Sequence, residues 1–318
     1  MREYIIRRVL YSIPSIIIVA TVVFMVLRLL PGDAALLMVL GGEDAQSDPE
    51  LYESLRHQMG LDKPIVLQYA EWMWNAAHGD FGTSYWTHEP VFQKILDRLP
   101  VTMEIGIGAV FIGVVIAIPW GVIAAVRQDH LADYLPRFAS VFLISIPNFW
   151  IATMLILLPA LWFHYMPPLR YVSFFDNPGA NLQMHIFPWV ATGTRLIGTT
   201  LRMTRSSMLE VLTQDYIRTA RAKGLREFAV LARHALKNAM IPVITIIGAQ
   251  FTFIFGGSVI IETVFGLPGI GNLTIQAINQ RDYPQIQGNV LFFSIIIIVL
   301  NLLTDLSYAI FDPRIRYE

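Results

Sequence analysis

Long runs of apolar residues separated by short polar segments dominate this chain of 318 residues. A helix needs roughly 20 apolar residues to cross about 30 Å of hydrocarbon, and five runs approach or exceed that length. They cover residues 9–30, 101–126, 134–163, 241–263 and 290–311. The pattern predicts an all-α, polytopic membrane protein.

A sixth candidate span, residues 185–203, is less apolar because it contains Arg195 and several threonines. The charges on either side of it favour a crossing there. Segment 31–100 carries eleven acidic and four basic residues, whereas loop 202–240 carries eight basic and three acidic ones. These segments prefer opposite sides of the membrane, so we predict six transmembrane helices.

The distribution of Lys and Arg predicts the orientation. Fifteen of them lie in the N-terminal segment, the loop after the second span, the loop 202–240 and the C-terminal segment, against six in 31–100, 164–184 and 264–289. Because basic loops stay in the cytoplasm, both termini are predicted to be cytoplasmic. The first apolar run is too long for a signal peptide and is followed by LPGD rather than a small-x-small cleavage site.

This topology divides the chain into three parts. They are the N-terminus with the first span over 1–30, a large external segment over 31–100, and a five-helix core over 101–318 that contains the loop 202–240. In the external segment we expect a helix beginning at Asp48-Pro49-Glu50, a turn at 62–64 and a helix over 67–77. Its acidic, aromatic-rich surface either receives a partner or shields the spans.

Composition narrows the possible chemistry. A mean hydropathy of +0.53 and only 15% charged residues fit a protein solvated mostly by lipid. The chain has no cysteine, and its seven histidines are scattered without ligand spacing, so neither a disulfide nor a metal site is expected. No phosphate-binding Gly-x4-Gly-Lys-[Ser/Thr] loop, His-Glu-x-x-His or Gly-x-Ser-x-Gly element occurs. We therefore predict no catalytic residues.

Two rival classes remain open. An intramembrane enzyme is one, because ionisable groups within spans are costly and often functional; the candidates are Glu104, Arg195, Glu262 and Asp305. A self-sufficient ion-coupled transporter is the other, but it would need an internal repeat with interrupted helices, and none is visible in the sequence.

Small residues recur at every fourth position of the second span, at Ala109, Gly113, Ala117, Gly121 and Ala125. Residues at this spacing share one helical face, and small ones let another helix approach closely. The partner helix could belong to the same subunit or to a second one.

The basic loop 202–240 cannot insert into the membrane, because burying its eight Lys and Arg residues would cost about 20 kcal/mol. We predict a helix over 208–223, a break at Gly224, and a second helix over 225–238. In the second helix Leu225, Phe228, Ala229, Ala232, Ala235 and Leu236 share an apolar face, while Arg226, Arg233 and Lys237 line another. Such a helix lies either on anionic lipid or in a shallow protein groove.

The loop contains DYIRTARAKGL at 215–225 and RHALKNA at 233–239. These stretches resemble the cytoplasmic signature of ABC importer permeases, and most of all the dipeptide/oligopeptide/nickel branch. Residues 218–220 occupy the Glu-Ala-Ala positions of the broad importer pattern, and Gly224 keeps its glycine. The resemblance extends over nearly the full chain, through 30–33, 60–64, 79–82, 98–102, 265–271, 281–284 and 301–305.

The resemblance implies a type I importer permease fold and a coupling helix that sits in a cleft of a cytoplasmic ATPase. The residues implied in coupling are Tyr216, Arg218, Thr219, Ala220, Arg221, Ala222, Lys223, Gly224, Leu225, Phe228, Arg233, His234 and Leu236. It also implies a second permease, two ATPases that bind ATP and Mg²⁺, and an external solute-binding protein, in a bacterial or archaeal cytoplasmic membrane. Lipid surrounds the assembly, and no nucleic acid is involved.

The resemblance implies peptide as the cargo, with nickel chelates, glutathione and oligosaccharides as alternatives. Polar residues that interrupt the fourth and fifth spans are candidates for the translocation path: Arg195, Gln250, Thr252, Ser258 and Glu262. The Gly- and Pro-rich stretch with Phe265, Pro268 and Gly269 forms either a re-entrant loop near the cargo or a plain surface turn.

Overall fold

The computed structural model describes residues 2–29, 34–40, 49–168 and 170–311. Within these residues the regular structure is helical, apart from a β-bridge between Thr83 and Pro90. The all-α prediction is confirmed. The LPGD stretch at 30–33, Asp48 of the predicted helix start, and the C-terminal Arg314 and Arg316 lie outside the described residues.

The chain forms two compact units, which we describe separately. Unit 1 comprises Met1–Val101 and Pro268–Ile298, and unit 2 comprises Thr102–Leu267 and Val299–Glu318. The stretch Pro268–Ile298, expected in the five-helix core, thus groups with the N-terminal part of the chain.

Unit 1 contains the external segment and its supporting helices. Its helices are α1 (Arg2–Leu29), α2 (Ala34–Leu40), α3 (Pro49–Gln58), α4 (Ile65–Ala77), the start of α5 (Val91–Val126), α12 (Ile270–Gln280) and most of α13 (Tyr283–Phe311). Its core packs apolar side chains from α1, α5, α12 and α13, among them Ala20, Ile95, Ile270 and Leu291. The predicted helix from Pro49, the turn at 62–64 and the helix ending at Ala77 are confirmed.

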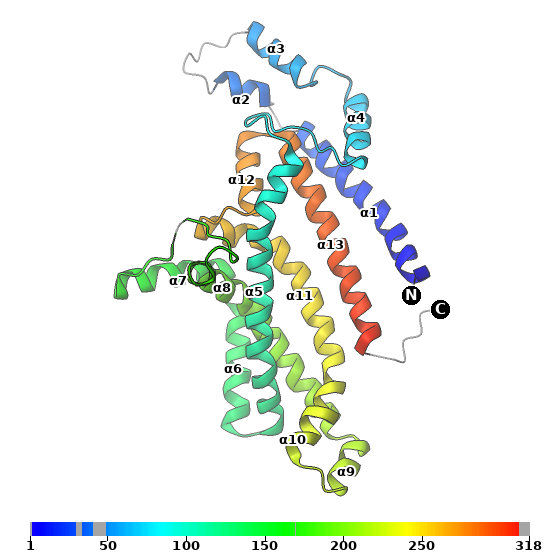
Figure 1. The fold of residues 1–318 in the computed structure, drawn as a ribbon, viewed down its shortest axis with the longest axis vertical. Coiled ribbons are helices and arrows are strands. Elements are labelled where there is room, and N and C mark those ends of the chain that lie inside the picture. Colours follow the sequence, from blue (N-terminus) through cyan, green and yellow to red (C-terminus); the bar gives the residue numbers. More distant parts are fainter. Residues whose placement is uncertain (1, 30–33, 41–48, 169, 312–318) are drawn as a thin grey trace. The chain divides into compact units, whose positions relative to one another are not determined.

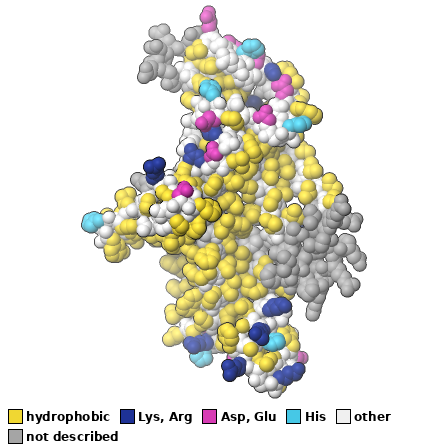
Figure 2. All heavy atoms as spheres, in the orientation of Figure 1, with side chains coloured by type: hydrophobic (Ala, Val, Ile, Leu, Met, Phe, Trp, Pro, Cys, Tyr) yellow, Lys and Arg dark blue, Asp and Glu magenta, His cyan; other side chains and the backbone are white. Residues whose placement is uncertain are grey.

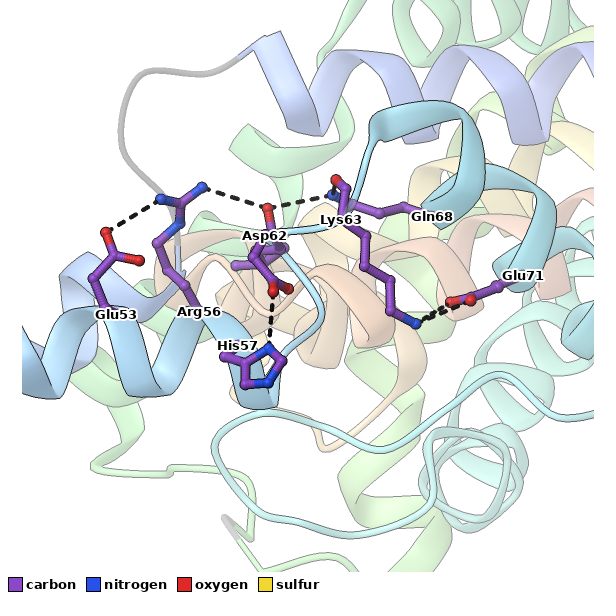
Figure 3. A network of polar contacts seen from close by, with 8 residues as sticks. Glu53, Arg56, His57, Asp62, Lys63, Gln68 and Glu71 are labelled. Carbon is purple, nitrogen blue, oxygen red and sulfur yellow. Dashed lines mark hydrogen bonds and ion pairs between the residues drawn. The ribbon is translucent and has the colours of Figure 1, made fainter.

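Polar contacts fix the connection between α3 and α4 (Figure 3). Nδ1 of His57 lies 2.8 Å from an Asp62 carboxylate oxygen, and Nζ of Lys63 lies 2.8 Å from a Glu71 oxygen. The hydrogen bond from His57 holds the pKa of Asp62 below its usual value. Because these groups are exposed, they set the geometry of the connection more than they stabilise it.

Unit 2 is built around one long helix, α8 (Pro178–Leu212). Its elements are the rest of α5, α6 (Leu131–Ser145), α7 (Asn148–Phe163), α8, α9 (Asp215–Ala222), α10 (Glu227–Ala229), a π-helical segment η1 (Val230–Ala235), α11 (Leu236–Phe265) and the end of α13. Helix α8 contacts α6, α7 and α11. Among its buried positions is a run of small and hydroxyl residues from Ala191 to Thr194.

The small-residue stripe of the second span packs against α8 of the same chain. A Cβ on Gly113 would lie 2.4 Å from Leu196, and one on Gly121 would lie 2.6 Å from Thr204. On the other helix, a Cβ on Gly193 would come within 2.9 Å of the backbone oxygen of Ala109. The stripe therefore serves packing within the subunit, which decides between the two readings of the sequence.

An ion pair joins α6 to α8. The carboxylate of Asp133 is fully buried and accepts hydrogen bonds from Nε of Arg205 at 2.5 Å and from its Nη2 at 2.7 Å. A bidentate pair of this kind fixes both the distance between the two side chains and their relative orientation. The pair sets the position of α8 beside the start of α6.

The predicted span over 134–163 is not one continuous helix. The chain forms α6 and α7 there, and the two helices are bent by 99°. Pro147 lies at the break, where it has no N–H to continue the helix of α6. Its extended backbone then starts α7 in a new direction.

Length and apolarity qualify four described helices as membrane spans: α1, α5, the run from α10 through α11, and α13. The bent pair α6–α7 would be a fifth. Helix α8 corresponds to the sixth predicted span. It has 35 residues, long enough to cross, but is not among the helices that qualify by apolarity. The count of six stays a prediction.

Candidate functional site

The basic loop after α8 begins with a short separate helix. The predicted helix over 208–223 is wrong in extent, because α8 ends at Leu212 and α9 starts only at Asp215. The backbone of Gln214 is extended, and the chain turns there. α9 is therefore a separate helix and not a continuation of α8, and it lies at one end of unit 2 (Figure 1).

Gly224 ends this short helix, as predicted. Its φ of +75° lies in the left-handed region that favours glycine. The N–H of Gly224 donates to the carbonyl of Arg221 at 2.9 Å, and that of Leu225 donates to Ala220. A glycine in this conformation is a common helix terminator.

The second predicted helix, over 225–238, is also wrong as a separate element. Helical structure resumes at Glu227, passes through the π-helical turn of η1 and continues directly into α11. The predicted single apolar face is divided, because Ala235 is buried whereas Phe228 is 82% exposed. Of the predicted coupling residues on this stretch, Arg233 is exposed, and His234 and Leu236 are half-buried.

One side of α9 packs against the rest of unit 2. Ile217 and Ala220 are buried in an apolar cluster, which we call the coupling-end cluster, with Ala125, Met208, Val230, Ala235 and Ala239. Because Ala220 is enclosed here, it supports α9 from within. The opposite side exposes Tyr216, Arg218, Thr219, Arg221, Ala222 and Lys223.

Two polar contacts hold the outer side of α9. Nη2 of Arg221 lies 2.8 Å from Glu227, and the amide of Asn238 donates to the hydroxyl of Tyr216 at 3.0 Å. Lys and Arg side chains gather at this end of unit 2 (Figure 2). The result is a short helix, supported from behind by apolar packing and presenting a basic surface with Leu225 and Phe228 exposed beside it.

A polar stripe runs along the exposed side of α8. Arg195, Thr199, Arg202 and Ser206 follow one another at helical spacing. Thr199 is partly exposed and the other three are exposed, while the residues between them are mostly buried. In hydrocarbon an exposed mid-span arginine is costly. A stripe of this kind fits a wet surface better than a lipid-facing one. Of these four residues only Arg195 was predicted for the path, although the regular spacing of polar residues along the helix could have indicated all four.

Arg195 and Gln250 come together at a cavity of about 300 Å³ between α8, α11 and the bend of α6–α7. Thr192, also in the lining, is buried, and its hydroxyl has no hydrogen-bond partner within the described part of the chain. The guanidinium of Arg195 lies 5.2 Å from the ring centre of Phe253. Gln250 also lines a second hollow of about 400 Å³ with Thr199, Arg202 and Ser206.

The other three candidates for the path are engaged elsewhere. The hydroxyl of Thr252 lies 3.0 Å from Oδ1 of Asn301, and that of Ser258 donates to the carbonyl of Phe255. Glu262 is fully buried and accepts a hydrogen bond from Thr102 at 2.8 Å. The structure brings together only Arg195 and Gln250 of the five.

Glu104, a candidate for intramembrane chemistry, lies in a network of hydrogen bonds. Tyr171 donates to one carboxylate oxygen at 3.1 Å and Asn181 to the other at 2.8 Å, while Trp189 donates to the backbone carbonyl. Nε2 of His185 lies 3.4 Å from the carboxylate. This arrangement ties the segment before α8 to α5. No group of three or more His, Asp or Glu side chains suited to a metal occurs among the described residues.

The Gly- and Pro-rich stretch connects two helices. α11 ends at Phe265, which is buried, and Gly266 follows with a φ of +64°. Pro268 follows, and Gly269 is the residue before α12. The segment is a helix-to-helix connection in which Leu267 and Gly269 are buried as well, and its place near the cargo stays a prediction.

The sequence of this chain matches models of a known protein family. Residues 117–317 match the family model described as "Binding-protein-dependent transport system inner membrane component", and residues 1–106 match the model of its N-terminal part. A putative peptide transport system permease protein of Brucella abortus is 42% identical over 318 residues, covering all of both chains.

The dipeptide transport system permease protein DppB of Escherichia coli K12 is 38% identical over 341 residues, again covering all of both chains. Among solved structures, a chain of the inward-facing MetNI methionine ABC transporter superposes with a TM-score of 0.55. It shares 16% identity and covers 70% of this chain and 99% of its own. That likeness shows a shared permease fold.

Proposed function

Since the chain belongs to the inner membrane components of binding-protein-dependent transport systems, the ABC importer permeases, we propose that it carries peptides across the cytoplasmic membrane. The peptide assignment rests on relatives that cover the whole chain and whose names specify peptide and dipeptide transport. It is a multi-pass transport subunit rather than an enzyme.

The observation that carries the proposal is the construction of α9. Ile217 and Ala220 anchor it in the coupling-end cluster, so force on its outer side is transmitted to the base of α8 and α11. Its exposed basic side fits the acidic rim of a partner's cleft, and Phe228 offers an apolar contact. The rival lipid-surface reading fits less well, because Ala235, expected on the apolar face, is turned inward.

The partners follow from this role. We infer that two ATPase subunits bind ATP and Mg²⁺, since no phosphate-binding loop occurs in the sequence. We infer a second, homologous permease and an external solute-binding protein that delivers the peptide. Both termini and α9 would lie in the cytoplasm, as the distribution of basic residues predicts.

Substitution of Gly224 tests the coupling role. Proline cannot adopt a positive φ and removes the hydrogen bond to Arg221. In the complex reconstituted with its binding protein, Gly224→Pro should insert normally but lower peptide uptake by at least about tenfold, either by uncoupling ATP hydrolysis or by releasing the ATPase. Gly224→Asn is the matched control, because Asn tolerates positive φ, and it should retain most of the uptake. Normal uptake by the Pro variant would refute the coupling role.

Cargo is tested separately with the same wild-type complex. Binding protein loaded with a dipeptide should stimulate ATP turnover, and binding protein loaded with glutathione or a nickel chelate should not. If only glutathione or only a nickel chelate stimulated ATP turnover, that compound would be the cargo in place of peptide. The assignment of the chain as an importer permease would stand.

A further inference from the structure

We propose that the cavity at the bend of α6–α7 is a binding site for the C-terminal carboxylate of the transported peptide, with Arg195 as its counter-charge. The inference rests on the proposed function and adds the ligand chemistry of one position on the path. Three independent features of the cavity point to an anion.

The first feature is the charge of the lining. Arg195 is its sole ionisable residue, and no Asp or Glu side chain pairs with Arg195 within the described residues. The neighbouring lining is largely apolar, with Leu196, Phe253 and Ile254 among its members. An arginine in such surroundings lacks the counter-charge that intramembrane arginines usually have.

The second feature is the beginning of α7. Its first residues, Asn148 and Phe149, line the cavity. The first N–H groups of an α-helix have no partner inside the helix, and the N-cap residue of α7, Pro147, has no side chain that caps them. α7 has 16 residues, so the positive end of its dipole adds to the charge of Arg195. The break at Pro147 is what brings this helix end to the cavity beside α8 and α11.

The third feature is the unpaired hydroxyl of Thr192. The residue is 4% exposed and lines the same cavity as Arg195, one helical turn earlier on α8. Its oxygen has no hydrogen-bond partner within the described residues. A buried hydroxyl without a partner is unfavourable. The oxygen exposes almost no surface, so a carboxylate in the cavity would accept its hydrogen bond once the side chain rotates toward it.

A carboxylate is the anion that suits the proposed cargo. Every peptide with a free C-terminus carries this group whatever its side chains are, so one fixed site can serve peptides of different sequence. A volume of about 300 Å³ is at the lower limit for small-ligand sites and holds the end of a peptide. Arg202 lies seven residues further along the same stripe, about 10 Å away, where it can receive the carboxylate as the cargo advances.

The chain has no cysteine, so a single introduced thiol reports on the cavity. Ser145 lines the cavity, whereas Ser140 on the same helix is buried outside it. Both hydroxyls donate to a carbonyl of α6, which makes Ser145→Cys and Ser140→Cys a matched pair. The full complex, with cysteine-free partner subunits, is placed in phosphatidylcholine vesicles without anionic lipid and treated with small anionic or cationic methanethiosulfonates.

We expect the thiol at 145 to react and the thiol at 140 to stay unmodified. The anionic reagent should be favoured at 145, and adding Arg195→Gln should reduce that preference about tenfold, whereas Arg195→Lys should keep most of it. Equal reactivity of the two thiols, or a preference that survives Arg195→Gln, would overturn the proposal.

Protection by peptide identifies the ligand. Dialanine at millimolar concentration should slow modification of the thiol at 145, and dialanine amide, which lacks the carboxylate, should not. Equal protection by both, or by neither, would overturn the carboxylate assignment. Peptide uptake by the wild-type complex is measured in parallel. If uptake is normal while protection fails, only this inference falls. If the complex takes up no peptide, the proposed function falls.

Discussion

Tyr171 shows how one residue couples a surface segment to the helices of unit 2. Its hydroxyl donates to Glu104, and its ring packs edge-on against His185. Burial, together with the nearby charge of Glu104 and the hydrogen bond to it, raises the pKa of Tyr171 to about 12 from its ordinary value of about 10. The residue therefore stays protonated in the folded protein well into the alkaline range.

This shift predicts a dependence of stability on alkaline pH. Because the folded state holds the proton more tightly than the unfolded state, the contribution of Tyr171 is complete below about pH 10 and is lost as pH rises toward about 12. Ultraviolet absorbance of tyrosinate, compared between wild type and Tyr171→Phe, should show one tyrosine ionising near pH 12. If the variant instead lost a titration step near pH 10, Tyr171 would ionise like an ordinary tyrosine. That result would contradict the environment described for this residue.

At the level of elements, α8 is the helix on which unit 2 depends. Its packed sides carry Gly193 and Gly198 close to the backbone of α5 and α6, and its remaining side carries the polar stripe. One helix therefore packs against the other helices of unit 2 and also carries the polar residues of the candidate translocation path. This double role explains its composition, which is too polar for an ordinary span yet almost without charge on its buried sides.

The close approach of α8 and α5 predicts the effect of a single methyl group. In Gly193→Ala the new Cβ would lie 2.9 Å from a backbone oxygen, which cannot move without shifting α5. We expect a loss of about 1–3 kcal/mol, seen as a lower midpoint of thermal aggregation in detergent. Gly256→Ala on α11 is the control, because its Cβ would meet nothing within 4 Å. Equal midpoints for the two variants would show that the helices do not pack as described.

At the level of the whole molecule, orientation is the property on which every functional proposal depends. The basic surface of α9 must face the cytoplasm to meet an ATPase, and the acidic segment with α3 and α4 must face outward to meet a binding protein. The positive-inside rule predicts both placements.

Single cysteines test this orientation directly. Trp74 on α4 and Lys223 after α9 are both exposed, so either position tolerates a thiol. In intact cells with the outer membrane permeabilised, a membrane-impermeant maleimide should label Trp74→Cys and leave Lys223→Cys unlabelled. Disruption of the inner membrane should expose the second position. The reverse pattern would place α9 outside the cell and exclude its contact with a cytoplasmic ATPase.

The class of fold, most of the spans, the expected orientation and the break at Gly224 follow from the amino-acid sequence alone. These properties depend on composition over consecutive residues, on total charge, or on a backbone conformation that one residue type favours. The family resemblance also follows from local stretches such as 215–225 and 265–271. Local information was sufficient for each of them.

The place where the apolar run over 134–163 breaks depends on tertiary contacts. Pro136 and Pro159 lie inside helices, whereas the chain bends at Pro147. All three remove a backbone donor, and whether a helix continues past such a residue depends on what neighbouring elements satisfy and fill. The cavity with Arg195 and the uncapped start of α7 exists because of that bend. Residues that are distant in the sequence line this cavity together, and no local sequence pattern predicts that they do.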